Sequence, residues 1–149
     1  MTLVFDFFDG TDPRLPEALL IREAVFVREQ GIDPNLELDD YDFIAWHVLV
    51  KDDEKPVGTA RLVTQDAQTT KIGRVAVLPE ARGRGIARMM VSMLVEYSKR
   101  EGFSRVILDA QLPVVPFYEK LGFKGTGQFF LDADLPHQRM ELDLRGSVH

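Results

Sequence analysis

The sequence predicts an α/β fold arranged around one sheet. Two observations carry this prediction. Segments with the period-two pattern of strands alternate with segments whose apolar residues recur at helical spacing, and three strand-like segments follow one another in mid-chain without a helix between them. A chain of 149 residues suits one domain with a sizeable core. We therefore expect a single domain over residues 1–149, in the order β-α-β-β-β-α-β-α-β-β.

The first third of the chain predicts a strand, a long helix and an acidic loop. Residues 2–8, "TLVFDFF", are rich in aromatic and aliphatic side chains, as in a strand. Residues 12–31 have apolar positions at helical spacing, Asp12 can cap this helix, and Gly31 ends it. Residues 33–42 hold five acids and no base, so we expect an exposed loop there.

Three strands and a second helix come next. "AWHVLVK" (45–51) and "PVGTARLV" (56–63) flank the polar "DDEK", which predicts an antiparallel hairpin. "TKIGRVAVLP" (70–79) is a third strand, closed by its proline. From Gly85 to Arg100 the apolar side chains repeat at helical spacing, and a glycine follows as the stop signal.

The last third predicts a buried strand, a short helix and a closing pair of strands. The buried strand is "SRVILDA" (104–110) and the short helix is "VVPFYEKLG" (114–122). The closing strands are "KGTGQFFLD" (124–132) and "HQRMELDL" (137–144).

Charge and composition narrow the class of protein. The net charge of −6 argues against general nucleic-acid binding, which usually shows a basic excess. With no cysteine the chain has no disulfide, no thiolate metal ligand and no cysteine nucleophile. The opening residues lack a basic leader, and no run of about 18 apolar residues occurs. We expect a cytoplasmic protein with no membrane span.

A turn rich in glycine and arginine, "PEARGRGIARMM" (79–90), joins the third mid-chain strand to the second helix. The start of a helix offers backbone N–H groups without intrahelical partners and the positive end of the helix dipole, a combination that suits phosphate. Arg82 and Arg84 add positive charge. The turn therefore predicts an anion site, with a plain helix start carrying solvated arginines as the alternative.

Two nucleotide motifs fail on this turn. A P-loop needs a Lys followed by Ser or Thr, and the dinucleotide pattern G-x-G-x-x-G meets Arg88 at its last position. The remaining pattern, R-x-x-G-x-A over residues 82–87, resembles the pyrophosphate loop of the GNAT acetyltransferase superfamily. "VLPEARGRGIA" and, about 30 residues further on, "FYEKLGF" (117–123) are also similar to that superfamily, in the right order and on the right elements.

The resemblance implies the GNAT acyl-CoA N-acyltransferase fold. In this fold a mixed, mostly antiparallel central sheet is flanked by helices, and its fourth and fifth strands splay apart. It also implies an N-acetyltransferase that moves the acetyl group of acetyl-coenzyme A to a primary amine of a small molecule or peptide. The helix end "VFVREQG", the acidic loop, "WHVLV" and "PHQRMEL" also resemble a bacterial subgroup of small single-domain members. A homodimer is a family-level expectation.

The resemblance further implies which residues bind acetyl-coenzyme A. Backbone groups of Val75, Ala76 and Val77 would pair with the pantetheine arm. Backbone amides of the turn would hold the pyrophosphate; these residues are Arg82, Gly83, Arg84, Gly85, Ile86 and Ala87.

Tyr118 occupies the place where many members of the family carry a tyrosine that protonates the departing thiolate. A phenol can donate a proton to a thiolate, although the same residue could serve only for packing near the sulfur. The family's best-known base, a glutamate on the fourth strand, is missing from "TKIGRVAV". Candidates for this role elsewhere are His47, His137, Asp109 and the acids Glu37, Asp39 and Asp40, with a solvent-assisted route as the alternative. Each histidine also has a structural interpretation, a core hydrogen bond for His47 and a capping role for His137.

The acceptor site of such folds lies between the first helix, the loop after it and the last strands. Here Arg28, Glu29, Glu37, Asp39 and Asp40 would give a mixed, mainly acidic rim. Such a rim would attract cationic amines, although acid-rich loops are also commonly just solvated.

Two other functions stay open. One is a GNAT-fold module that senses coenzyme A or binds a protein without catalysis. The missing glutamate on the fourth strand is the reason for this alternative. The other, a dinucleotide-binding domain, is disfavoured by the incomplete glycine pattern. No metal is expected, because the histidines are not clustered and cysteine is absent.

Overall fold

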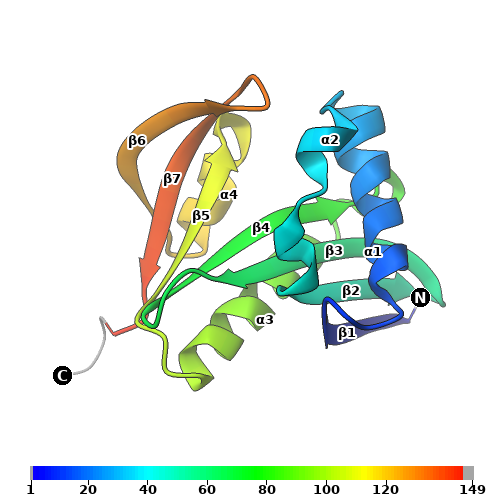
Figure 1. The fold of residues 1–149 in the computed structure, drawn as a ribbon, viewed down its shortest axis with the longest axis horizontal. Helices are drawn as coiled ribbons and strands as arrows, with labels where there is room; N and C mark the ends of the chain where they lie inside the picture. Colours follow the sequence, from blue (N-terminus) through cyan, green and yellow to red (C-terminus); the bar gives the residue numbers. More distant parts are fainter. Residues whose placement is uncertain (1, 146–149) are drawn as a thin grey trace.

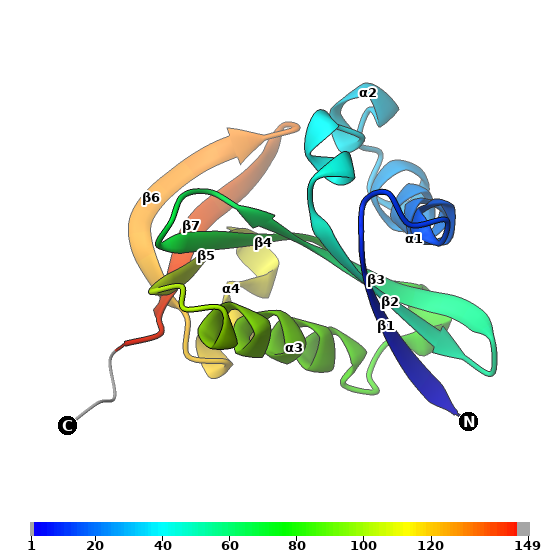
Figure 2. The same ribbon diagram turned by 60° about the horizontal axis from the view of Figure 1, so that its bottom comes forward.

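The computed structural model describes residues 2–145, which form one seven-stranded sheet with helices on both faces (Figures 1 and 2). The strands are β1 (Leu3–Asp9), β2 (Trp46–Asp52), β3 (Lys55–Thr64), β4 (Thr69–Val77), β5 (Arg105–Gln111), β6 (Lys124–Asp132) and β7 (Leu135–Asp143). The α-helices are α1 (Leu15–Arg22), α2 (Pro34–Glu37), α3 (Ile86–Arg100) and α4 (Val115–Lys120). A π-helix, η1 (Glu23–Glu29), follows α1, and the short 3₁₀ turns are η2 (Asp40–Phe43), η3 (Pro79–Ala81) and η4 (Leu112–Val114).

The order of strands across the sheet is β1-β2-β3-β4-β5-β7-β6. Neighbouring strands are antiparallel except β4 and β5, which are parallel. The expected α/β class and the mixed, mostly antiparallel sheet are confirmed.

The parallel ladder between β4 and β5 is short. It begins with Thr69 opposite Arg105 and stops with Ile72 opposite Leu108. Beyond that point β4 pairs with β3 alone and β5 pairs with β7 alone. Figure 1 shows the two strands diverging from this shared end, so the expected splay is confirmed.

A β-bulge bends β4 at the start of the splay. Thr59 of β3 faces Ala76 and Arg61 faces Gly73, so two residues of β4 stand opposite Ala60 alone. One of the two, Arg74, has a φ of 52°, in the left-handed region that a non-glycine side chain rarely adopts. Bulges of this kind bend a strand and redirect its side chains.

The sheet is buried on both faces because side chains alternate along its strands. On β2, Val48 and Val50 pack into the cluster that contains Leu94 of α3. Leu49, between them, packs into the other cluster with Ile21 of α1. Figure 2 shows α3 and α1 on opposite sides of the sheet.

The first helix differs from the prediction in two respects. It begins after Arg14, and Asp12 accepts hydrogen bonds from the N–H and guanidinium of Arg14 instead of capping the helix. After α1 the chain widens into η1, where the N–H of Gln30 donates to the C=O of Val25, five residues earlier (3.1 Å). Gly31, with a φ of 74°, ends the segment as predicted. Among residues 2–145 no helix is long and apolar enough to cross a membrane.

Gly10 follows β1 at a close approach of two backbone segments. A Cβ at this position would lie 2.6 Å from the backbone carbon atoms of Phe43 and would clash with the carbonyl oxygen of Asp42. We expect Gly10→Ala to cost about 3 kcal/mol or more, because backbone atoms cannot move aside as a flexible side chain can. The midpoint of thermal unfolding should fall by roughly 6–12 °C.

Gly73→Ala is the matched control, because a Cβ there meets no atom of the described part of the chain within 4 Å and the residue has an ordinary φ. It should unfold within a few degrees of the wild type. Equal midpoints for the two variants would contradict the close approach at Gly10.

Candidate functional site

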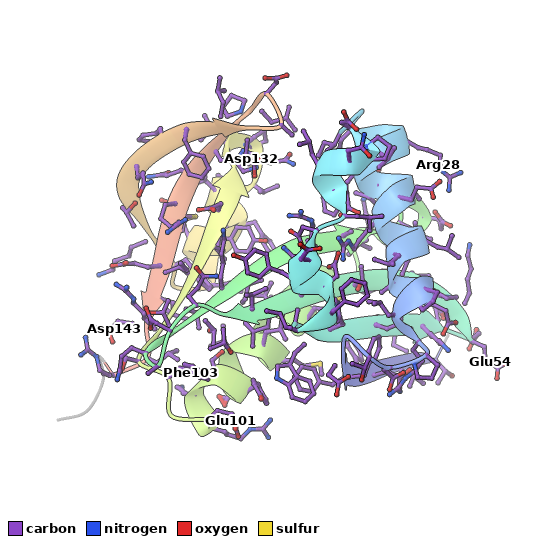
Figure 3. All side chains as sticks on the ribbon, in the orientation of Figure 1. Arg28, Glu54, Glu101, Phe103, Asp132 and Asp143 are labelled. Carbon is purple, nitrogen blue, oxygen red and sulfur yellow. The ribbon has the colours of Figure 1, made fainter. Side chains whose placement is uncertain are left out.

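A cavity of about 750 Å³ opens where β4 and β5 separate. Its walls come from β4, β5, the turn before α3, the segment from η1 to α2, α4, and the turn between β6 and β7. Figure 3 shows Asp132 at the end of β6, on the opposite side of the splay from Arg28. The volume is in the range of pockets that hold small ligands or cofactors.

The turn before α3 presents backbone amides at one end of this cavity. Gly83 and Gly85 have φ values of 81° and 78°, and Gly85 is the residue before the first turn of α3. The first intrahelical bond runs from the N–H of Met89 to the C=O of Gly85 (3.0 Å), so the amides before Met89 have no partner within the helix. No side chain of residues 2–145 caps this end. The geometry suits an anion.

The three arginines of this turn differ in their contacts. Arg82 donates to both carboxylate oxygens of Glu29 on η1 (2.7 and 2.6 Å) and to the C=O of Val77 (2.9 Å). Arg84 contacts Asp52 at 2.9 Å. Arg88 lines the cavity, and its guanidinium has no hydrogen bond or ion pair to any of residues 2–145. The sequence indicated Arg82 and Arg84 as the cationic residues, and it left Arg88 without a role.

Tyr118 stands in the cavity wall on α4, with 7% of its surface exposed. Its ring makes edge contacts with Phe117 (4.9 Å between centroids) and Phe123 (5.9 Å). Burial raises the pKa of the hydroxyl to about 12. Within residues 2–145 that hydroxyl makes no hydrogen bond, so both its proton and its lone pairs are available to a ligand.

The acidic segment after η1 is an ordered wall of the cavity, and the expectation of an exposed loop is wrong for Glu37 and Asp42, which are 4% and 3% exposed. Arg22 binds Glu37 (2.8 Å) and Asp42 (2.6 Å). Arg61 also binds Asp42 (2.9 Å), and Asp39 completes the set through Arg61 and Arg74 (2.6 and 3.3 Å). The network formed by Arg22, Arg61, Arg74, Glu37, Asp39 and Asp42 is called the arginine–acid network below.

Arg74 extends this network to the splay. It contacts the carboxylate of Glu37 at 3.1 Å, and its Nε and Nη2 donate to the C=O of Glu37 at 3.1 and 2.9 Å. The bulge of β4 is therefore tied to the end of α2. Sequence reasoning missed this role, although Arg22 on the buried face of a helix and Arg61 within an apolar strand were signals for it.

A second charged cluster lies on β4, β5 and β7. The ammonium of Lys71 contacts Asp109 at 3.0 Å, and the Nε and Nη2 of Arg139 also donate to that carboxylate. Burial alone would raise the pKa of Asp109, but Arg139 and Lys71 outweigh it and lower the pKa. Asp109 is thus a weak proton acceptor, which reduces the case for it as a general base.

The two candidate histidines lie in different surroundings. His47 is 1% exposed, donates from Nε2 to the C=O of Asp42 (2.9 Å) and stacks on Phe8. Burial lowers its pKa, and it is not among the residues that line the cavity. His137 does line the cavity, and its Nδ1 donates to the C=O of Leu135 (2.7 Å), which leaves Nε2 as an acceptor in the neutral ring.

The expected acceptor residues are only partly brought together. Glu29 and Glu37 line the cavity, but arginines bind both of them. Arg28 pairs with Glu23 at 3.4 Å and points away from β5 and β7 (Figure 3). Among residues 2–145 no three His, Asp or Glu side chains gather as a metal site would require.

Known proteins of the acetyltransferase class are similar to this chain. The family model described as "Acetyltransferase (GNAT) family" matches residues 15–123. The uncharacterized N-acetyltransferase YjcF of Bacillus subtilis (strain 168) is 36% identical over 133 residues, which cover 89% of this chain and 94% of that protein.

Two solved structures share the fold at 26% sequence identity. A putative N-acetyltransferase from Lactobacillus plantarum superposes with a TM-score of 0.87, covering 97% of this chain and 99% of its own. An acyl-CoA N-acyltransferase from Pseudomonas aeruginosa superposes with a TM-score of 0.84, covering 94% and 99%.

The arginine–acid network predicts a pH dependence of stability. Burial alone would raise the pKa of Asp42, but Arg22 and Arg61 outweigh it and lower the pKa to about 2. A depressed pKa stabilises the fold above the unfolded value of about 3.9, and this contribution of about 2–3 kcal/mol is lost as the pH falls towards 2. Asp42→Asn should therefore be less stable at neutral pH and lose less stability than the wild type during acidification.

Urea unfolding at a series of pH values measures this difference. Asp40→Asn is the control, because Asp40 is an exposed neighbour outside the network, and its profile should follow the wild type. Parallel profiles for Asp42→Asn and the wild type would contradict the assigned role of Asp42.

Proposed function

Because the chain belongs to the acetyltransferase (GNAT) family, we propose that it transfers the acetyl group of acetyl-coenzyme A to a primary amine. The observation that carries this proposal is the cavity between the splayed strands, with strand backbone along one side and helix-start amides at one end. A thioester can lie along β4 with its pyrophosphate at the turn.

The open edge of β4 would hold the pantetheine arm. The N–H of Leu78 donates to Val57 of β3 (2.8 Å), and successive amides of a strand point to opposite edges. The N–H of Val77 therefore points into the splay. There, with backbone groups of Val75, it would pair with the amides of pantetheine or polarise the thioester carbonyl, as a neighbouring strand would. The backbone of Ala76 faces β3, where it pairs with Thr59, so we leave it out of this role.

The turn before α3 would hold the pyrophosphate. Amides of residues 82–87 supply the neutral donors, and the helix dipole adds to them. Since Glu29 binds the Arg82 guanidinium and Asp52 contacts that of Arg84, we propose Arg88 as the charged partner of the phosphates.

In the proposed reaction the neutral amine attacks the thioester carbonyl, the C–S bond breaks, and coenzyme A leaves as a thiolate. The Tyr118 hydroxyl would act as general acid by donating to the departing sulfur. A phenol with a pKa of about 12 lies about 3.5 pH units above a thiol, so complete transfer would be uphill by about 5 kcal/mol. The hydrogen bond from Tyr118 would therefore stabilise the developing charge, and solvent would complete the protonation.

The attacking amine must lose a proton. We propose that His137 accepts this proton, directly or through water. His137 lines the cavity, and because its Nδ1 makes the bond to Leu135, its Nε2 is left as the proton acceptor. His47 is left out because a backbone carbonyl and a phenyl ring enclose it outside the cavity.

Tyr118→Phe tests the chemical step. We expect the release of free thiol from acetyl-coenzyme A, followed across a panel of amines, peptides and small metabolites, to fall by about tenfold to a thousandfold in kcat. The thermal stabilisation that acetyl-coenzyme A produces should persist, because only one hydroxyl is lost.

Tyr97→Phe is the matched control. Tyr97 lies on α3, packs against Phe7 of β1 and Trp46 of β2, and is not part of the cavity wall. Its kcat should equal that of the wild type. Unchanged turnover in Tyr118→Phe would remove the proposed acid. Binding of acetyl-coenzyme A without turnover on any acceptor would favour the non-catalytic sensing module.

Arg88→Met tests the phosphate site. The dissociation constant for coenzyme A, measured by calorimetry, should rise by about tenfold or more, because a charge-assisted contact is lost. Arg100→Met, an exposed arginine on the last turn of the same helix, should bind as the wild type does. If Arg88→Met bound normally while Arg82→Met did not, the assignment would pass to Arg82.

A further inference from the structure

The segment from η1 to η2, where an acidic rim was expected, presents no unpaired carboxylate of residues 2–145 to the cavity. In the arginine–acid network three guanidinium groups balance three carboxylates. Of the other two acids expected at the rim, Glu29 is balanced by Arg82, and Asp40 is exposed and does not line the cavity. The expected attraction for cationic acceptors therefore loses its basis here, because the carboxylates that would provide it are already paired.

Lys71 lies on this wall and comes from the strand that would hold the cofactor. It stands opposite Val63 of β3 and Ile107 of β5, at the end of β4 where the parallel ladder is still intact. Its side chain is 34% exposed and lines the cavity. Lys71 lies four residues before Val75 on the same strand, and both residues line the same cavity.

The charges around Lys71 leave a positive excess. One carboxylate, Asp109, stands between the ammonium of Lys71 and the guanidinium of Arg139. Arg139 uses two of its nitrogen atoms on that carboxylate, whereas the ammonium of Lys71 has three donors and one partner. Of the two cations, Lys71 is the one that lines the cavity, so the excess positive charge lies there.

Other cations of the wall are less available. Arg61 and Arg74 donate to Asp39, and the remaining bonds of each go to other members of the arginine–acid network or to carbonyls of α2. Asp132, at the turn between β6 and β7, is the acid that faces this region from the opposite wall. It makes no ion pair within residues 2–145 that would neutralise Lys71.

We propose that Lys71 binds a carboxylate of the acceptor, so that the substrate class is an amine that also carries a negative charge. This inference rests on the acetyl transfer proposed above. The bound carboxylate would take the free donors of the ammonium and direct the amine along β4 to the thioester.

Three probes of similar size separate the charge classes. γ-Aminobutyrate carries an amine and a carboxylate, n-butylamine carries the amine alone, and putrescine carries two amines. Calorimetric binding to the protein saturated with coenzyme A should favour γ-aminobutyrate over n-butylamine. In Lys71→Met the affinity for γ-aminobutyrate should fall by about tenfold, while that for n-butylamine stays unchanged.

Two further variants separate recognition from structure. Lys71→Arg should restore most of the preference, because a guanidinium also binds a carboxylate. Lys99→Met removes a surface lysine paired with Glu96 on α3 and should change nothing. Equal or better binding of n-butylamine or putrescine by the wild type would overturn the proposal, as would an unchanged preference in Lys71→Met.

Turnover distinguishes this inference from the proposed function. Thiol release with putrescine but not with γ-aminobutyrate would keep the acetyltransferase and remove the anionic acceptor. Selective binding of γ-aminobutyrate without thiol release from acetyl-coenzyme A would keep the anion site and remove the proposed reaction.

Discussion

The end of the parallel ladder after Ile72 and Leu108 is the constraint on which the rest of the site depends. Backbone groups of a strand need partners, and two neighbouring strands that separate leave a row of them facing each other across a gap. The bulge at Arg74 turns β4 out of the ladder, and pairing with β7 carries β5 away on the other side. Each strand stays paired with its other neighbour, β4 with β3 and β5 with β7, so the two strands can remain apart.

Charge pairing holds the wall above this opening in place. The segment from α2 to η2 buries few apolar side chains, and Leu36, Leu38 and Phe43 are largely exposed. Arginines from α1, β3 and β4 take the place of a hydrophobic anchor there. Buried ion pairs add little net stability but are costly to break singly, since the remaining partner is left charged and buried. The ion pairs therefore fix the position of this wall more than they add to the stability of the fold.

The spacing of apolar residues predicted the strands and helices well, because each element has a characteristic spacing within a few residues. The splay followed only from the resemblance carried by "VLPEARGRGIA" and "FYEKLGF". The partners of charged residues could not be predicted, since Glu37 lies 15 positions from Arg22 and 37 from Arg74. For this reason a segment with five acids predicted an exposed loop, whereas the structure shows three of these acids paired in the arginine–acid network.

The π-helix η1 has a consequence for insertions and deletions. Its wider turn accommodates an extra residue between α1 and the glycine that ends the segment. Deleting one residue from Glu23–Glu29 would let the chain continue as an α-helix, in which each residue turns about 100°. Because the wider turn takes up the extra residue, the side chains after it would keep their faces, and Glu29 would still meet Arg82. This segment can therefore lose one residue and keep the contact between η1 and the turn before α3.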